Sequence, residues 1–159
     1  MIVNERQNLV ARFREGAAAV MAAVQGLRDG EAEAYEAPGE WSVRQIVHHL
    51  ADTELMRGAR LFRLLVDDQP IIQGFDEEAF ARRLHYEREI ESSVAAFCSV
   101  RQSLASLLEK LTEEEWSREG IHSEIGPYRV ETLVQRGVDH ALEHADQIRR
   151  ARSRWASAV

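Results

Sequence analysis

Helical spacing of apolar residues runs through almost the whole chain and limits the folds open to it. In the first segment, apolar side chains recur every three or four residues, at Leu9, Val10, Phe13, Ala17, Val20, Met21, Val24 and Leu27. Helix-breaking prolines occur at only three positions, Pro38, Pro70 and Pro127. No segment shows the strict alternation of apolar and polar residues that is typical of a half-buried strand. The sequence therefore predicts long helices with few interruptions.

Helix breakers and capping motifs divide this pattern into four long helices. We expect them at about residues 4–27, 42–66, 88–111 and 130–151. The second helix begins at a capping box, in which the Ser42 hydroxyl accepts from the Gln45 backbone and the Gln45 side chain reaches back. Trp41 precedes this cap and can pack on the first turn of the helix.

The connections between these helices differ in length. Residues 70–86 are expected to form a long crossover with a short helical piece at about 76–84. A second capping box at residues 112–115 starts a short turn that ends near Trp116. Residues 120–128 contain a glycine-proline pair and are expected to form a loop.

Helix length and chain length together indicate the fold class. A helix of about 20 residues is roughly 30 Å long, the length of a bundle rod. The chain has 159 residues, which suits one domain. We therefore predict an all-α fold, an up-down four-helix bundle with one long crossover, as a single domain over residues 1–159.

Composition excludes some classes of function. The formal net charge of −7 argues against nucleic-acid binding and against an anionic membrane surface. No apolar run approaches the roughly 18 residues of a membrane span. A short basic run near the C-terminus is explained by the favourable interaction of cations with the end of a helix; it comprises Arg149, Arg150, Arg152 and Arg154.

Cys98 is the only cysteine, so the chain contains no intrachain disulfide, and this fits a reducing cytoplasm. The first residues lack a basic segment followed by an apolar one, so no signal peptide is expected. Cys98 lies on the apolar stripe of the third helix and is interpreted as a core residue and not as a nucleophile.

Two histidines on the last predicted helix share one face. His140 and His144 are four residues apart, so their Cβ atoms lie about 5–6 Å from each other and both imidazoles can reach one metal ion. Such a pair is weak support alone, because a single histidine is more often an ordinary core or surface residue.

His49 adds a third inward-facing imidazole from the second helix. A buried polar group without a partner costs roughly 1–3 kcal/mol, and three such histidines avoid this cost by sharing one ion. Three nitrogen donors suit a divalent transition metal such as Zn, Ni, Fe or Co. His48 is rotated about 100° around the helix and is expected to face elsewhere.

Two segments resemble the metal-binding motifs of the DinB/YfiT-like superfamily. Residues 41–54 read WSVRQIVHHLADTE and resemble the start of its second helix, and residues 140–148 read HALEHADQI and resemble its C-terminal motif. The resemblance implies a four-helix bundle that is often a homodimer. It also implies that His49, His140 and His144 bind one divalent metal ion.

The activity implied by the resemblance is less uniform. Characterised relatives include transferases that use a low-molecular-weight thiol, such as bacillithiol, mycothiol or glutathione, and a mycothiol-dependent isomerase. Many others are labelled metal-dependent hydrolases on structural grounds. A metal-dependent enzyme acting on a small-molecule substrate is therefore the leading hypothesis. The alternatives are a non-catalytic metal-binding stress-response protein and a metal-free helical interaction module.

Four charged residues near the histidines are candidates for a role in the chemistry. Asp52 lies one turn from His49, and Glu143 one turn from His140; each can orient a ligand histidine or act as an acid or base. Arg57 and Arg60 lie further along the second helix and can attract an anionic substrate. Most such charges are solvated, and surface ion pairs are the ordinary explanation for both arginines.

Overall fold

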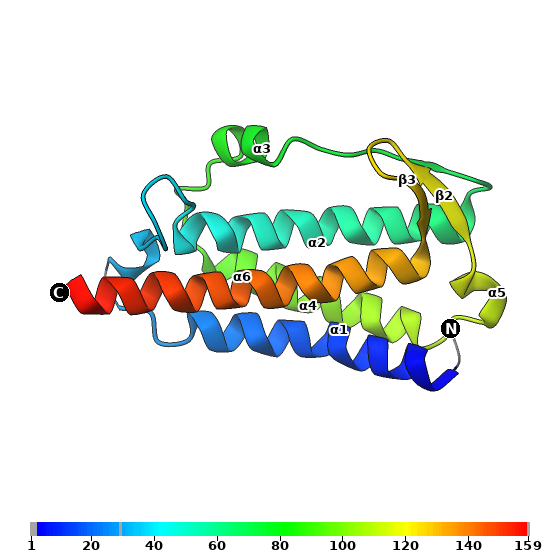
Figure 1. Cartoon of the computed structure of the whole chain (residues 1–159), viewed down its shortest axis with the longest axis horizontal. Helices are drawn as coiled ribbons and strands as arrows, with labels where there is room; N and C mark the ends of the chain where they lie inside the picture. The colour runs from blue at the N-terminus through cyan, green and yellow to red at the C-terminus, as the bar shows by residue number, and fades with distance from the viewer. Residues whose placement is uncertain (1–2, 29, 159) are drawn as a thin grey trace.

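The computed structural model describes residues 3–28 and 30–158. Four long helices form a bundle (Figure 1): α1 (Val3–Val24), α2 (Val43–Val66), α4 (Glu91–Leu108) and α6 (Val130–Ala158). The predicted four-helix bundle is therefore confirmed. The predicted helix bounds differ from the observed ones by at most three residues, except that α6 continues seven residues beyond the expected end at 151. No helix in the described part of the chain is both long and apolar enough to cross a membrane.

The long crossover determines how the helices are arranged. Residues 67–90 run back along the bundle, so α2 and α4 point in the same direction, whereas α1 and α6 point the opposite way (Figure 1). Both α1 and α2 pack against α4 and α6. Helices α1 and α2, although consecutive in sequence, therefore lie diagonally across the bundle.

Local capping explains where several helices begin. The capping box predicted at Ser42 is present: Gln45 N donates to Ser42 Oγ, and Ser42 N donates to Gln45 Oε1. Thr112 forms the same motif at the start of α5 (Glu113–Trp116), as predicted. Within the crossover, Asp76 caps α3 (Glu77–Arg83), which confirms the short helical piece expected there.

The prediction of a loop at residues 120–128 was wrong. Strands β2 (Glu119–His122) and β3 (Gly126–Arg129) form an antiparallel hairpin, and β1 (Ile71–Ile72) pairs with β2 in parallel. These strands are too short to show a period, and β3 contains the glycine-proline pair that is usually depleted in strands. Their pairing comes from tertiary contacts, because backbone groups of the crossover accept from β2 and the residue after it.

A second short segment, the 3-10 helix η1 (Glu31–Glu33), explains why α6 is longer than expected. Arg152 on the last turns of α6 donates to Glu31 at 2.9 Å and to backbone carbonyls after α1. Arg150 donates to Glu36 at 2.6 Å. Arg150, Arg152 and Arg154 of the basic run thus bind carboxylates and carbonyls of the segment between α1 and α2, and these contacts stabilise the additional helical turns.

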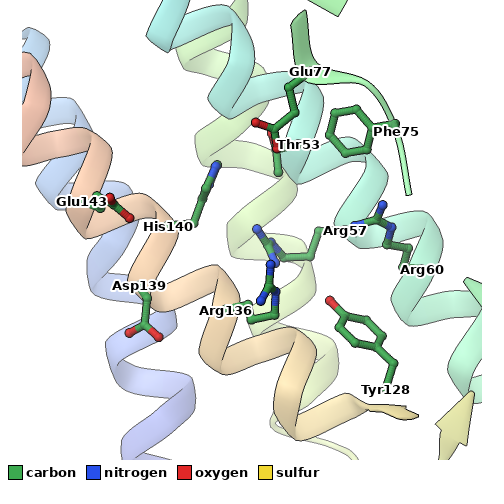
Figure 2. Close-up of a pocket in the computed structure, with 10 residues that line it drawn as sticks. All are labelled: Thr53, Arg57, Arg60, Phe75, Glu77, Tyr128, Arg136, Asp139, His140 and Glu143. Carbon is green, nitrogen blue, oxygen red and sulfur yellow. The ribbon is translucent and has the colours of Figure 1, made fainter. Parts of the chain in front are cut away.

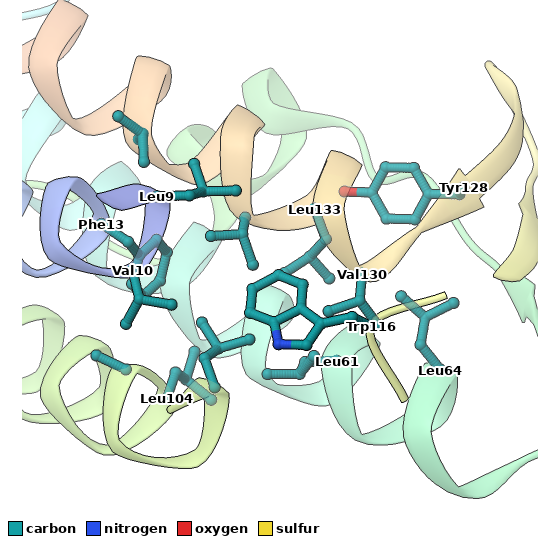
Figure 3. Close-up of a cluster of buried hydrophobic side chains, with 14 of the residues drawn as sticks. Leu9, Val10, Phe13, Leu61, Leu64, Leu104, Trp116, Tyr128, Val130 and Leu133 are labelled. Carbon is teal, nitrogen blue, oxygen red and sulfur yellow. The ribbon is translucent and has the colours of Figure 1, made fainter. Parts of the chain in front are cut away.

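The interior contains two apolar clusters. One surrounds Trp116 and lies at the end of the bundle that carries the sheet; Figure 3 shows several members, including Phe13, Leu61 and Leu133. The other packs around Phe97 and Ile148 towards the opposite end. Cys98 is half-buried against this second cluster, in agreement with its interpretation as a packing residue.

Candidate metal centre

Three histidines converge between α2 and α6. His49 comes from α2, and His140 and His144 come from successive turns of α6. One nitrogen from each ring lies within 4.8 Å of the others, and the Nε2 atoms of His49 and His140 are 2.9 Å apart. The structure thus brings together the three residues predicted as metal ligands.

Burial favours the neutral form of two of these imidazoles, His49 and His140. Burial lowers the pKa of His49 to about 3, with smaller contributions from His144 and Arg57. Burial likewise lowers the pKa of His140 to about 2, and the nearby His144 and His49 add to this effect. A neutral imidazole keeps one nitrogen with a free lone pair, which is the form that binds metal ions.

Two neutral imidazoles facing each other through Nε2 can share only one hydrogen atom, and the third ring points at the same place. A cation at the meeting point would satisfy all three lone pairs. The donor set therefore fits a divalent transition metal, with three nitrogen ligands.

Two residues not singled out as site residues from the sequence support the cluster. Gln147 Oε1 accepts from His144 Nδ1 at 2.8 Å, which places the hydrogen on Nδ1 and leaves Nε2 free to bind. Trp41 packs edge-on against the His49 ring, with centroids 4.7 Å apart. Gln147 lies at position i+3 from His144, and this spacing was a signal available in the sequence.

His48 faces away from the cluster, as predicted. Its Nε2 donates to the Arg88 carbonyl at 2.9 Å, so its Nδ1 accepts from the Ser93 hydroxyl at 2.8 Å. Both ring nitrogens are used in these contacts, and His48 is a satisfied buried residue that joins α2 to α4.

The two carboxylates proposed from the sequence lie in different surroundings. Asp52 accepts from the Tyr86 hydroxyl at 2.7 Å, which ties the end of the crossover to α2. Among the described residues, no hydrogen bond joins Asp52 to a histidine of the cluster. Glu143 is exposed and lines the same pocket as His140.

A pocket of about 270 Å³ opens beside His140 (Figure 2). Helix α2 contributes Thr53, Arg57 and Arg60 to its lining, and α6 contributes Arg136. The remaining lining residues are Phe75, Glu77, Tyr128, Asp139, His140 and Glu143. Its volume lies near the lower end of the range for small-molecule sites, roughly 300–1,000 Å³.

Tertiary structure adds residues to this pocket that were not predicted. Arg136, Glu77 and Tyr128 come from α6, α3 and β3, and no local motif marks them. Arg57 was expected to form a surface ion pair, but its side chain is buried and pairs with the buried Glu54. The surrounding protein raises the pKa of the Glu77 carboxyl by desolvation.

Comparison with known proteins agrees with this architecture. Residues 12–148 match the family model described as the DinB superfamily. A protein of Oceanobacillus iheyensis named "Putative metal-dependent hydrolase OB0413" is 31% identical over 130 residues, which is 82% of this chain and 75% of that protein. A Geobacillus thermodenitrificans protein named "Putative metal-dependent hydrolase" is 32% identical over 150 residues, 91% of this chain and 83% of the other.

A solved structure has the same fold. YfiT from Bacillus subtilis, described as "a probable metal-dependent hydrolase with an unusual four-helix bundle topology", aligns with a TM-score of 0.91 at 23% identity. The alignment covers 98% of this chain and 90% of YfiT. With its family match, its relatives and its bundle topology, this chain belongs to the DinB superfamily.

Proposed function

We propose that His49, His140 and His144 bind one divalent transition metal ion and that the chain uses it to hydrolyse a small molecule. The observation that carries the proposal is the convergence of three imidazoles on one point, with one of them, His140, in the lining of a pocket. The names of the relatives, which describe metal-dependent hydrolases, support the same reaction class.

Held by the three histidines, such an ion would keep coordination positions open and would supply Lewis-acid chemistry, namely activation of water near neutral pH and polarisation of a carbonyl or phosphoryl oxygen. Glu143 and Glu77 line the pocket, and we assign them the exchange of a proton with substrate or water. Asp52, bonded to Tyr86, is assigned the role of positioning the crossover beside the site. Gln147 holds His144 in the ligand tautomer.

A second candidate is transfer of a low-molecular-weight thiol to an electrophile at the same ion. An open coordination position binds a thiolate as well as water. The arginines of the pocket offer partners for the carboxylates that a thiol cofactor would carry. This reaction differs from hydrolysis in needing a second small molecule.

Assembly as a homodimer is also part of the proposal. Leu55, Phe62 and Val66 lie on the outer side of α2 and are 52%, 53% and 80% exposed. Their spacing places them along one face of the helix, where an apolar surface suits a partner subunit. Sedimentation equilibrium of wild type and a Phe62→Ser variant tests this assignment. If the dimer forms through this face, the variant should dissociate more readily than wild type; a dimer through another face should be unaffected.

The metal is tested by elemental analysis of untagged protein. Wild type is compared with a His140→Ala/His144→Ala double variant. The matched control is His85→Asn, since His85 is exposed, lies outside the pocket and has a φ of 54° that asparagine tolerates. Near one equivalent of metal in wild type and control, and none in the double variant, is expected.

Activity is then tested on metal-loaded protein with esters, amides and phosphoesters, and separately with thiols plus electrophiles. Hydrolysis that is lost in the double variant supports the first candidate; turnover only with thiol supports the second. Metal without turnover would indicate a non-catalytic metal-binding protein. Absence of metal even after reconstitution with Zn or Ni would reject the proposal in favour of a helical interaction module.

A further inference from the structure

Charge is unevenly distributed in the pocket beside His140. Arg57, Arg60 and Arg136 gather on one side of His140, with Tyr128 next to them (Figure 2). Two acidic lining residues, Asp139 and Glu143, lie on the other side of His140 in the same view. The third acidic lining residue, Glu77, lies beside Thr53 on the arginine side of His140, so this end of the pocket carries three guanidinium groups and the Glu77 carboxylate.

Arg57 is held rigidly at the cationic end. Its Nε donates to Glu54 Oε2 at 3.3 Å and its Nη1 to the Leu133 carbonyl at 3.1 Å. Its side chain is only 7% exposed. Among the described residues no partner is found for Nη2, the remaining nitrogen. A preorganised guanidinium of this kind binds an anion with little loss of conformational freedom.

Arg60 lies one turn further along α2 and is fixed by the crossover. Its Nη2 donates to the Gln73 carbonyl at 2.7 Å, and its guanidinium lies 5.4 Å from the centre of the Phe75 ring. Its Nε is buried, with no partner in the described part of the chain. Burial lowers the pKa of Arg60; the neighbouring Arg57 and Arg136 act in the same direction, whereas Tyr128 and Glu124 oppose it.

Arg136 faces these two residues from α6. It is exposed, and within residues 3–28 and 30–158 it forms no hydrogen bond or ion pair. The nearby Asp139 accepts instead from Gln135 at 2.8 Å. Of the three guanidinium groups, only Arg57 forms an ion pair with a carboxylate within the described residues. Glu77 and Glu124 lie near Arg60 without pairing with it, so the arginines outnumber the carboxylates here and favour an anion.

We propose that Arg57, Arg60 and Arg136 bind an oxyanion of the substrate, a carboxylate or a phosphate, and hold its reactive bond towards the histidine cluster. Guanidinium groups match the geometry of both oxyanions and bind them through charge-assisted hydrogen bonds. The substrate class is therefore a small anionic molecule. The inference rests on the proposed function for the identity of the reaction, but binding of the anion can be measured without the reaction.

The test is a chemical-shift titration of isotopically labelled full-length protein, as purified and again after chelation of metal. The probes are phenylphosphonate, benzoate and benzamide, which share a ring but differ in charge. Tighter binding of at least one anion than of neutral benzamide is expected in both preparations, with shifts at the three arginine side chains. Comparison of phenylphosphonate with benzoate identifies the oxyanion.

Arg136→Gln is the decisive variant, because Arg136 is exposed and its replacement leaves the core intact. Its affinity for the preferred anion should fall about three- to tenfold, as expected for loss of a partly screened charged hydrogen bond, and benzamide affinity should stay unchanged. Arg60→Gln should act in the same direction. The control Arg12→Gln makes the same charge change at an exposed position of α1 outside the pocket and should have no effect.

Two results would overturn the inference: equal affinity for benzamide and both anions in wild type, or an Arg136→Gln affinity for the anion equal to that of Arg12→Gln. Neither result depends on bound metal. A chain that binds anions but no metal keeps this site and loses the proposed function. If the protein binds and uses metal but does not prefer anions, the proposed function stands and the anion site is rejected.

Discussion

The Arg101 guanidinium on α4 and the Glu54 carboxylate on α2 form an ion pair of 2.9 Å in the centre of the bundle, with each side chain 1% exposed. Arg101 also donates to the carbonyls of Phe13 on α1 and Gly137 on α6, at 2.5 and 2.7 Å. One side chain thereby connects all four long helices. Because Glu54 also accepts from Arg57, the same network reaches the pocket.

Glu54→Gln should therefore be strongly destabilising. The substitution leaves two buried guanidinium groups without their counter-charge, and breaking a buried ion pair in this way costs roughly 3–5 kcal/mol. Urea unfolding, compared with wild type, measures the change. The control Glu15→Gln removes an exposed carboxylate from α1 and should change the free energy of unfolding by less than about 0.5 kcal/mol. Equal midpoints for the two variants would contradict a structural role for the pair.

The position of Arg101 also explains a glycine inside α1. A Cβ atom at Gly16 would lie 2.7 Å from Arg101 Nη2 and 3.0 Å from the Ala141 Cβ. Gly16→Ala should destabilise the protein by about 1–3 kcal/mol through overpacking, although alanine favours helices.

Gly58→Ala is the matched control for that substitution. Gly58 is also a buried helical glycine, but the nearest atom to its added Cβ, Leu104 Cδ2, is 3.5 Å away, an ordinary contact. The gain in helix propensity should then stabilise the protein by up to about 1 kcal/mol. Thermal melting of both variants measures the difference, and two shifts of the same sign would refute the argument from space.

Gln147→Leu should weaken metal binding without unfolding the bundle. It removes the acceptor of the His144 Nδ1 hydrogen, and loss of such a supporting bond typically lowers metal affinity about 10–100-fold. Competition with a chromophoric chelator measures the affinity. Gln102→Leu, at an exposed position of α4, is the control and should bind metal as wild type does. If the two variants bind equally, Gln147 does not position the histidine.

The ion pair between Glu31 and Arg152 should make stability depend on pH in the acid range. The Arg152 hydrogen bond, as the largest cause, lowers the pKa of Glu31 from 4.5 to about 2. A folded-state pKa below the unfolded value means that the stabilisation is fully present above pH 4.5. It is lost as the pH falls towards 2, because the unfolded chain then binds more protons.

Comparison of wild type with Glu31→Gln isolates this contribution. At pH 7 the variant should be less stable by about 1–3 kcal/mol, the usual value for a buried hydrogen bond to a charged group. The difference in urea midpoint should shrink between pH 4.5 and pH 2.5. A difference that stays constant over this range would show that the Glu31 carboxylate is not the titrating group.

Much of the helical framework could be predicted from the sequence because its signals are local. Apolar spacing of three and four residues located the four long helices, and the Ser42 and Thr112 capping boxes located two helix starts. The sheet could not be predicted in this way. Its strands are short, and β1 and β2 pair across a separation in the sequence from Ile71 to Ile121.

The candidate site likewise has one part that the sequence determined and one part that only the tertiary structure determined. His140 and His144 meet because positions four residues apart share a helix face, so their proximity was determined by the sequence alone. His49 lies 91 residues from His140, and only the packing of α2 against α6 brings their Nε2 atoms to 2.9 Å. The sequence indicated that His49 faces inward and can share an ion with the histidine pair, and the family resemblance implied the same ligand set, but neither gave the distance between them.

What the sequence by itself determined was therefore the set of helices, their caps and the histidine pair on one face, because short-range periodicity and hydrogen bonding control these features. Tertiary structure decided the rest. The crossover makes α2 and α4 parallel and places Glu77 and Phe75 beside α2, and the packing of α2 against α6 brings Arg136 opposite Arg57 and Arg60. No local sequence motif indicates these contacts, because only the packing of distant segments determines which side chains share one pocket.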